Sequence, residues 1–380
     1  MTKILLDTQI FTRQKFGGIS RYFIELYSVF SRNEQLNIDF PILYTSNLYF
    51  KETHFYESGF QKKYSFLIKY SKILRPFLPR KLERKGTKKV IELLKRQEFD
   101  VFIPTYYDPY FLPHIKTKPF VLTVHDMIHE LYPQYFSNEP ETIQNKKVLI
   151  ENATKIIAIS ENTRKDLIRI YPQIDPGKIE VIYLAHTVKN GPLKELDVPE
   201  RYILFVGQRS AYKNFHFFLK AVSSLIHEYT DLFVFCAGGN SFTEEELALI
   251  KELNISDRVL QKNFEDSELS SYYSKALCFV FPSEYEGFGI PVLEAMAAAC
   301  PVVLTKASSF PEVAGDAGIY FELNNCEDLT NKIDELLNDA TLRQVYKTKG
   351  ITQASKFSWE KTAEETFKVY QQAIKSSYNG

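Results

Sequence analysis

The amino-acid sequence has no long apolar run, few cysteines and no net charge, and each shortage excludes a class of protein. Apolar stretches such as Ala295 to Leu304 fall well short of the roughly 18 residues that a membrane-spanning helix needs. The four cysteines are scattered and three lie in apolar stretches, which indicates reduced thiols in the cytosol rather than disulfides or a zinc site. Lysine plus arginine equals aspartate plus glutamate at 47 each, so the overall charge gives no sign of a nucleic-acid-binding protein.

Two further patterns are missing. No G-x-G-x-x-G occurs, which argues against a dinucleotide-dependent dehydrogenase. The first residues, MTKILLDTQIF, carry one basic residue and only a short apolar run, so they predict a first strand rather than a signal peptide. The composition is ordinary for a globular protein, at 44% hydrophobic and 25% charged residues, and 380 residues are enough for two domains.

What the sequence does have is a regular alternation of short apolar strands with helical stretches. In the first half we expect strands at 3–6, 37–44, 100–104, 120–124, 155–159 and 178–184, and helices at 19–30, 87–96 and 161–170. The second half repeats the plan, with strands expected at 202–206, 232–237, 278–281 and 302–304 and helices at 215–228, 244–252, 268–275 and 290–299. It ends in a helical tail at 329–337 and from Trp359. Buried strands that alternate with helices imply parallel sheets with helices on both faces. Two such series predict an α/β protein with two Rossmann-like doubly wound domains, which we place at 1–190 and 191–358.

The stretch from Phe279 to Val303 carries the most informative pattern. An apolar strand ends, a loop with two glycines follows, and a helix begins with Pro291 in its first turn. Glycines let a ligand approach the backbone closely, and the free N–H groups of a helix start favour an anion. Glu286 and Glu294 bracket this helix end and can accept hydrogen bonds from sugar hydroxyls. The pattern indicates a nucleotide sugar, and the alternative is a plain strand–loop–helix with solvated glutamates.

A second cluster follows the first strand of the second half. Gly207 opens a loop in which Arg209 and Lys213 precede the next helix. Ligands of doubly wound sheets bind at the carboxyl ends of the strands, where two cations can neutralise a diphosphate leaving group. The alternative interpretation is a solvated basic loop.

Two smaller clusters lie in the first half. His125 follows a strand directly, and a neutral imidazole can hydrogen-bond a sugar hydroxyl or relay a proton, although a histidine in this place is often structural. Gly17 and Gly18 form a glycine turn into a helix after the first strand, which is a weak signal on its own.

Taken in order, eight segments resemble the GT-B retaining glycosyltransferases of family 4, often described as glycosyl transferase group 1. They are GGISRY (17–22), TVHD (123–126), AISENTRKDL (158–167), VGQRSAYKN (206–214), ELSSYYSKA (268–276), EGFGIPVLE (286–294), PEVAGDAGIYF (311–321) and FSW (357–359). The resemblance implies two Rossmann-like domains that face a cleft. It makes 1–190 the acceptor-side domain and 191–358 the nucleotide-sugar-binding domain, with a final helix at 359–376 that packs back on the first.

The resemblance also implies roles for the donor-binding residues. Arg209 and Lys213 would hold the donor diphosphate, Glu286 would contact the transferred sugar and Glu294 the ribose. Further donor contacts are implied for Gly18, Gly207, Gly287, Phe288, Gly289 and Ile290. In many members the arginine follows the loop glycine immediately, whereas Gln208 takes that place here.

The catalytic group implied by the resemblance consists of His125, Glu286, Arg209 and Lys213. His125 would face the donor sugar across the cleft. No D-x-D occurs, as in the metal-independent GT-B group, and we expect neither a metal nor a cofactor.

The activity implied is a nucleotide-sugar-dependent hexosyltransferase that acts on an oligosaccharide or lipid-linked glycan in lipopolysaccharide or capsule synthesis. Its donor would be UDP- or GDP-linked. The family's retaining outcome is usually explained by front-face attack, in which the leaving phosphate takes the acceptor's proton, so no enzymatic nucleophile is named. A sugar-nucleotide epimerase of GT-B architecture and an inactive sugar-nucleotide-binding protein are the alternatives. The joint presence of the catalytic group and Glu294 argues against the inactive protein.

The zero net charge hides a basic segment. Residues 61–96 contain 13 lysines and arginines but only two acids, Glu83 and Glu92. Within residues 60–74, apolar side chains fall on one helical face and Lys62, Lys69 and Lys72 on the other. A basic amphipathic helix with aromatics can lie on an anionic membrane surface. We therefore expect a cytoplasmic protein, peripheral on the inner face of the plasma membrane, that binds no nucleic acid; the alternative is a solvated basic helix.

Overall fold

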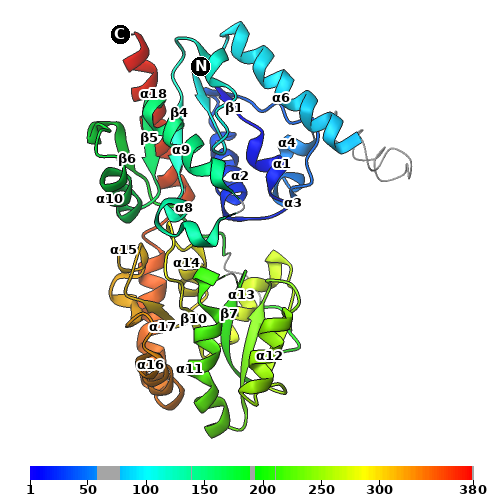
Figure 1. Ribbon diagram of the computed structural model, residues 1–380, viewed down its shortest axis with the longest axis vertical. Coiled ribbons are helices and arrows are strands. Elements are labelled where there is room, and N and C mark those ends of the chain that lie inside the picture. Colours follow the sequence, from blue (N-terminus) through cyan, green and yellow to red (C-terminus); the bar gives the residue numbers. More distant parts are fainter. Residues whose placement is uncertain (58–77, 138, 189–192, 210, 379–380) are drawn as a thin grey trace. The chain divides into compact units, whose positions relative to one another are not determined.

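The computed structural model describes residues 1–57, 78–137, 139–188, 193–209 and 211–378 (Figure 1). By their contacts the residues form two compact units. Unit 1 comprises Met1–Leu184 together with Trp359–Gly380, and unit 2 comprises Ala185–Ser358. The C-terminal helix therefore belongs to the same unit as the N-terminal strand. The helix expected over 60–74, including Lys62, Lys69 and Lys72, lies outside the described residues.

Unit 1 is built on parallel strands. They are β1 (Thr2–Leu6), β2 (Leu36–Asp39), β3 (Val101–Ile103), β4 (Val121–Val124), β5 (Lys155–Ala158) and β6 (Ile179–Val181). Their order is β2-β1-β3 and β4-β5-β6, and a parallel bridge between Phe102 and Phe120 joins the two sets. The carboxyl ends of β1, β3 and β4 thus share one edge, where the segments after Leu6, Ile103 and Val124 begin.

The helices of unit 1 flank these strands. They are α1 (Gln9–Arg13), α2 (Gly18–Phe30), α3 (Leu48–Lys51), α4 (His54–Glu57), α6 (Leu78–Arg96), α7 (Leu112–Ile115), α8 (Ile128–Leu131), α9 (Pro140–Asn152), α10 (Glu161–Ile170) and α18 (Trp359–Tyr378), with short 3-10 turns η1 (Pro133–Tyr135) and η2 (Pro176–Lys178). Helix α18, red in Figure 1, packs against α2 and β5. Its Tyr370 hydroxyl lies 3.1 Å from that of Tyr27, and the Thr362 hydroxyl donates to the Tyr183 carbonyl at 2.8 Å.

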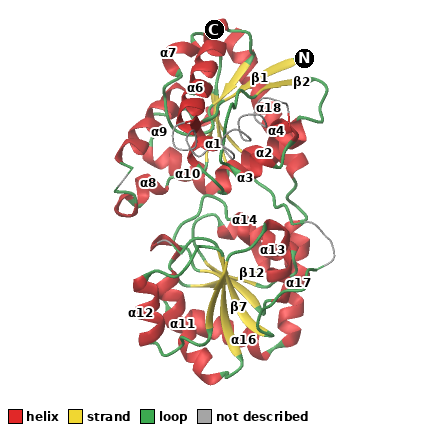
Figure 2. Ribbon diagram, turned by 90° about the vertical axis from the view of Figure 1, so that its right-hand side faces the viewer, coloured by secondary structure: helices red, strands yellow, loops and turns green. Residues whose placement is uncertain are grey.

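Unit 2 contains a parallel sheet with the order β12-β11-β10-β7-β8-β9. Its strands are β7 (Arg201–Val206), β8 (Leu232–Ala237), β9 (Val259–Lys262), β10 (Cys278–Phe281), β11 (Val302–Thr305) and β12 (Gly318–Phe321). Its helices are α11 (Phe215–Glu228), α12 (Glu244–Glu252), α13 (Asp266–Lys275), α14 (Ile290–Ala297), α15 (Phe310–Ala314), α16 (Cys326–Asn338) and α17 (Ala340–Ala354), with 3-10 turns η3 (Ala211–Lys213) and η4 (Gly315–Ala317). Figure 2 shows these helices on both sides of the strands.

Local signals explain why many elements begin where the sequence predicts. Ser160 caps α10 by accepting from the Thr163 amide, and Thr243 and Glu246 form a capping box at α12. The central strands β4, β10 and β11 are buried along their whole length, as expected for strands covered on both faces.

Some boundaries differ from the prediction. Strand β2 ends at Asp39, five residues before the expected end, because Pro41 offers no N–H for the ladder. Helix α6 begins at Leu78, well before the expected start at residue 87. Helix α17 was not predicted, because its polar sequence fully buries only Gly350 and Ala354.

Candidate active site

The predicted donor residues of unit 2 gather where the strand order of the sheet reverses. Strands β7 and β10 are neighbours in the sheet although they are far apart in the chain. Ligands of doubly wound sheets bind in the crevice at such a switch point, beyond the carboxyl ends of the strands. The loop after β7 carries Gly207 and Lys213, and the loop after β10 carries Glu286. A bond from the Glu284 amide to the Tyr212 carbonyl, 2.9 Å long, joins the two loops.

Lys213 and Glu286 form an ion pair across this switch point. The Lys213 ammonium contacts Oε1 of Glu286, and both side chains are only 14% exposed. The ammonium also lies 4.9 Å from the ring centre of Phe281, at the end of β10. A cation predicted to hold phosphate and a carboxylate predicted to hold sugar hydroxyls are therefore adjacent and partly desolvated.

Two serines that the sequence analysis missed hold the Glu286 loop in place. The Glu286 amide donates to the Ser308 hydroxyl at 3.0 Å, and the Ser309 hydroxyl lies 3.0 Å from the Glu286 carbonyl and 2.9 Å from that of Phe288. Ser309 is fully buried. Both serines follow β11, and the only sequence signal was their place after a buried strand.

The loop ends in a glycine whose conformation few other residues adopt. Gly289, the N-cap of α14, has φ +95°, and a β-carbon there would lie 3.1 Å from the Phe310 ring. The backbone of 287–290 therefore turns tightly into the helix start. Glu294 lies inside α14 and is 3% exposed. The structure thus brings Glu286 and Glu294 to the loop and the first turns of one helix, as the sequence predicted.

Arg209 has a different environment from Lys213. Its guanidinium donates to Oε1 of Glu246 at 2.8 Å and to the carbonyls of Gly238, Asn240 and Ser241 at 3.2, 3.1 and 3.0 Å. The Arg209 and Glu246 side chains are 3% and 5% exposed. Arg209 therefore ties the loop after β7 to the loop after β8. Its assignment to the donor diphosphate stays a prediction, because four of its five N–H groups already have protein acceptors.

In unit 1, His125 follows β4 and is buried. The imidazole is 6% exposed and packs against Tyr22 and Phe23 of α2 at centroid distances of 5.3 and 6.0 Å. Among the residues that the structure describes, its Nε2 has no hydrogen-bond partner. Burial lowers the pKa of His125 to about 4, with opposing effects from Asp126, which raises it, and Lys146, which lowers it. The imidazole is therefore neutral at physiological pH.

Gly18 begins α2, the helix whose Tyr22 packs against His125. The helix has no side-chain N-cap at Gly17, and the Ser20 amide donates instead to the side chain of Gln14 at 3.1 Å. A β-carbon at Gly17 would lie 2.6 Å from the same Gln14 oxygen, whereas one at Gly18 would meet nothing within 4 Å. A side chain at Gly17 would displace the Gln14 side chain from the helix start, whereas Gly18 leaves the backbone accessible.

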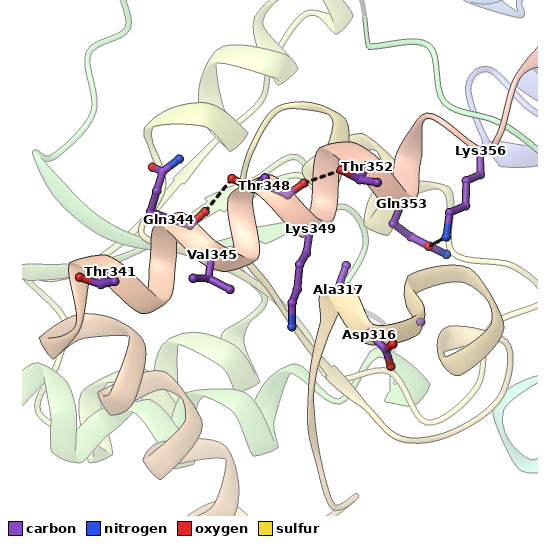
Figure 3. Close-up of a pocket in the computed structure, with 11 residues that line it drawn as sticks. Asp316, Ala317, Thr341, Gln344, Val345, Thr348, Lys349, Thr352, Gln353 and Lys356 are labelled. Atoms are coloured by element: carbon purple, nitrogen blue, oxygen red, sulfur yellow. Dashed lines mark hydrogen bonds between the residues drawn. The ribbon is translucent and has the colours of Figure 1, made fainter.

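A pocket of about 860 Å³ lies elsewhere in unit 2 (Figure 3). It is lined by α17 and the turn Gly315–Ala317, including Lys349 and Asp316. None of the predicted donor residues lines it. Two of its threonines bond back to the helix, Thr348 to the Gln344 carbonyl and Thr352 to the Thr348 carbonyl, both at 3.1 Å. We therefore assign the candidate site to the sheet edge rather than to this pocket.

Comparison with known proteins finds two matching family profiles. The profile described as "Glycosyl transferases group 1" matches residues 193–353, and that described as "Glycosyltransferase Family 4" matches residues 16–185. The chain is 28% identical over 280 residues to the O-antigen chain mannosyltransferase B of Escherichia coli, covering 70% of this chain and 73% of that protein.

A second relative acts on a lipid-linked glycan, according to its name. It is the N-acetylgalactosamine-N,N'-diacetylbacillosaminyl-diphospho-undecaprenol 4-alpha-N-acetylgalactosaminyltransferase of Campylobacter jejuni, 31% identical over 243 residues, or 62% of this chain and 65% of that protein. Among solved structures, Anabaena HepE in complex with UDP and glucose superposes with a TM-score of 0.70 at 16% identity, covering 98% of this chain and 99% of that chain.

The fold and the two profiles define a class of sugar-transferring enzymes. The chain belongs to glycosyltransferase family 4, the glycosyl transferases of group 1, and has the GT-B fold. The predicted family and the predicted pair of Rossmann-like units are thereby confirmed. Among the described residues, no helix combines the length and apolar character needed to cross a membrane, and no cluster of histidine, cysteine and acidic residues could hold a metal ion.

Proposed function

We propose that this protein is a retaining glycosyltransferase that moves a hexose from a UDP- or GDP-linked donor to a lipid-linked glycan during surface-polysaccharide synthesis. The observation that supports this best is the Lys213–Glu286 pair at the switch point of unit 2. It places a phosphate-binding cation beside a hydroxyl-binding carboxylate, next to the N-terminus of α14. The names of the relatives support the acceptor class.

Donor binding would exchange the partners of this pair. Lys213 would turn to the diphosphate, and Glu286 would accept hydrogen bonds from the transferred sugar. Stabilisation of the charge that develops on the leaving diphosphate is the main catalytic contribution we assign to the protein. As the bond from the anomeric carbon to the phosphate oxygen breaks, the acceptor oxygen bonds to the same face of that carbon. The acceptor's proton passes to the departing phosphate oxygen.

The remaining donor residues are assigned by the same proposal. Glu294 binds the ribose, and the neutral His125 contacts a hydroxyl of the transferred sugar. Gly18 and Gly207 offer backbone that a phosphate can approach. No metal or other cofactor takes part in this scheme.

The experiment that tests the activity begins with donor choice. Thermal shifts with UDP-, GDP-, ADP- and dTDP-sugars identify the nucleotide, and transfer to a lipid-linked acceptor is then followed by NMR of the anomeric proton. We expect an acceptor-dependent product with the anomeric configuration of the donor. Epimerised nucleotide sugar without acceptor, an inverted product, or no stabilisation by any nucleotide sugar would refute the proposal. Glu286→Gln should abolish transfer, and Glu327→Gln, an exposed glutamate on α16, serves as control.

The acceptor side of the proposal includes docking on an anionic membrane through α6. This helix buries Leu82, Val90 and Leu94 against unit 1. Its exposed basic residues are Lys81, Arg84, Lys85, Lys88, Lys95 and Arg96. Each lysine or arginine near an anionic surface contributes about 1 kcal/mol, and the attraction falls off within about 8 Å at physiological salt.

Vesicle sedimentation tests this docking. Wild-type protein should bind vesicles that contain phosphatidylglycerol, release them at high salt, and ignore neutral vesicles. Replacing Lys81, Lys85 and Lys88 with glutamine should reduce binding. The same change at Lys220, Lys251 and Lys275, exposed lysines of unit 2, should not. Equal binding by both triple variants would exclude α6 as the docking surface.

A further inference from the structure

A lysine outside the predicted donor and catalytic residues is completely buried in unit 1. Lys146 lies on α9, and its side chain is 0% exposed. The ammonium donates to Oε2 of Glu130 at 2.9 Å and to the carbonyl of Asp126 at 3.1 Å, and it lies 4.0 Å from Oδ1 of Asp126. Glu130 is itself only 4% exposed.

These contacts hold both ends of the segment that follows β4. Asp126 comes directly after His125, and Glu130 belongs to the short helix α8, which is too short to be stable on its own. Tyr107 connects the same ammonium to the histidine. Its ring centre lies 5.0 Å from the Lys146 ammonium, and its hydroxyl accepts a bond of 3.1 Å from the His125 amide.

Stability alone does not explain a buried ammonium in this place. Removing two charges from water costs nearly as much as their attraction returns, so apolar residues of similar volume often replace a buried ion pair without loss of stability. A lysine can, however, fix a loop geometry and set the local electrostatic field. Both would act on the neighbouring imidazole.

We propose that Lys146, together with Glu130, is a positioning residue that holds the His125 imidazole in place for the transferred sugar. This inference rests on the proposed function, in which His125 contacts the donor. The pair acts through the backbone of Asp126 and through Tyr107 and touches no substrate. It is a buried support for the histidine.

Titratable groups of several elements face His125. Asp126 is its chain neighbour, Lys146 approaches from α9, Tyr107 from the segment after β3, and Tyr22 from α2. Burial raises the pKa of Tyr22 to about 12, so Tyr22 stays neutral over the range in which the enzyme is assayed. The charges that matter for the imidazole are therefore those of Asp126 and Lys146.

The test is a double-mutant cycle on turnover. Lys146→Met/Glu130→Gln removes both charges, and the control Lys147→Met changes the adjacent lysine, which is 44% exposed. In the wild-type background we expect the double substitution to lower kcat by at least about tenfold with little change in the donor KM, because small displacements of a catalytic group are costly. In a His125→Ala background the same substitution should have less than about a twofold effect, because its target is already absent.

A second readout is specific to the histidine. With Lys146 gone, the pKa of His125 should rise, and the acid limb of the kcat profile should move to higher pH. The NMR titration of the His125 Cε1 proton should move in the same direction. If the double variant fails to fold, Lys146→Arg is carried through the same cycle, because it keeps the positive charge.

The outcomes separate the two proposals. An equal loss of kcat with and without His125, or no loss at all in a folded double variant, would overturn the positioning role while the transferase activity stands. Wild-type protein that turns over no sugar nucleotide would instead overturn the proposed function. A histidine pKa that is unchanged in the double variant would also count against the inference.

Discussion

Two buried groups in unit 1 should make opposite contributions to the pH dependence of its stability. Burial raises the pKa of Asp7, which follows β1, to about 6 from its ordinary 3.8, against the lowering effect of a hydrogen bond from Tyr110. Burial lowers that of His125 to about 4 from 6.5. One pKa unit is worth about 1.4 kcal/mol, so each shift amounts to about 3 kcal/mol over its whole range.

The signs follow from which form the fold prefers. The folded state prefers protonated Asp7, so this contribution is fully present below pH 3.8 and is lost as the pH rises through about 6. The folded state prefers neutral His125, so that contribution is present above pH 6.5 and is lost as the pH falls toward about 4. Between about pH 4.5 and pH 7, each changes the free energy of unfolding by about 2 kcal/mol, in opposite directions. In the wild type the two nearly cancel.

Substituting one of the two residues should reveal the pH dependence that the other contributes to the free energy of unfolding. Relative to wild type, Asp7→Asn should become more stable by about 2 kcal/mol as the pH rises across this window, and His125→Gln less stable by a similar amount. In the double variant the free energy of unfolding should again change with pH as it does in the wild type. The assay is urea unfolding followed by the fluorescence of Trp359, the single tryptophan, which is 7% exposed in unit 1 and lies 6.3 Å from the Tyr22 ring. Parallel pH profiles for all four proteins would refute the reasoning.

Three other predictions concern unit 2. Glu294→Gln should weaken nucleotide binding by about 1.5–3 kcal/mol, the value of a hydrogen bond to a charged group. Glu286→Gln should instead reduce kcat more than nucleotide affinity. Titration calorimetry and steady-state kinetics measure the two quantities, and equal small effects of both substitutions would show that the roles of the two glutamates are misassigned. Arg209→Met should destabilise unit 2 by about 3–5 kcal/mol, because it leaves the buried Glu246 carboxylate without its ion-pair partner. A calorimetric unfolding transition unchanged from wild type would show that this ion pair does not stabilise the unit. Gly289→Ala should cost about 1–2 kcal/mol of stability through backbone strain at φ +95°, and it should weaken donor binding. An unchanged free energy of unfolding together with an unchanged donor affinity would contradict the tight loop.

Much of this architecture could be predicted because local signals and global packing agree. The prediction located α10, α11, α12 and the strands β8 and β10 closely, since caps and apolar runs mark them. It missed β9, an edge strand in which only Val259 is buried, and α17, whose helical face is mostly polar. The alternation of buried and exposed residues in these two elements is too weak to be recognised in the sequence. The elements that pack against them supply their stability.

The amino-acid sequence by itself determined the family, the two parallel-sheet units and the residue types of the donor site, because glycine loops, helix starts and paired glutamates are local patterns. Only the tertiary structure decided which of these groups meet. It paired Lys213 with Glu286, which lie 73 residues apart, tied Arg209 to Glu246, and placed Lys146 beneath the segment that follows His125. Strand order in a sheet brings distant residues together, and burial sets their pKa values. Neither follows from the spacing of residues along the chain.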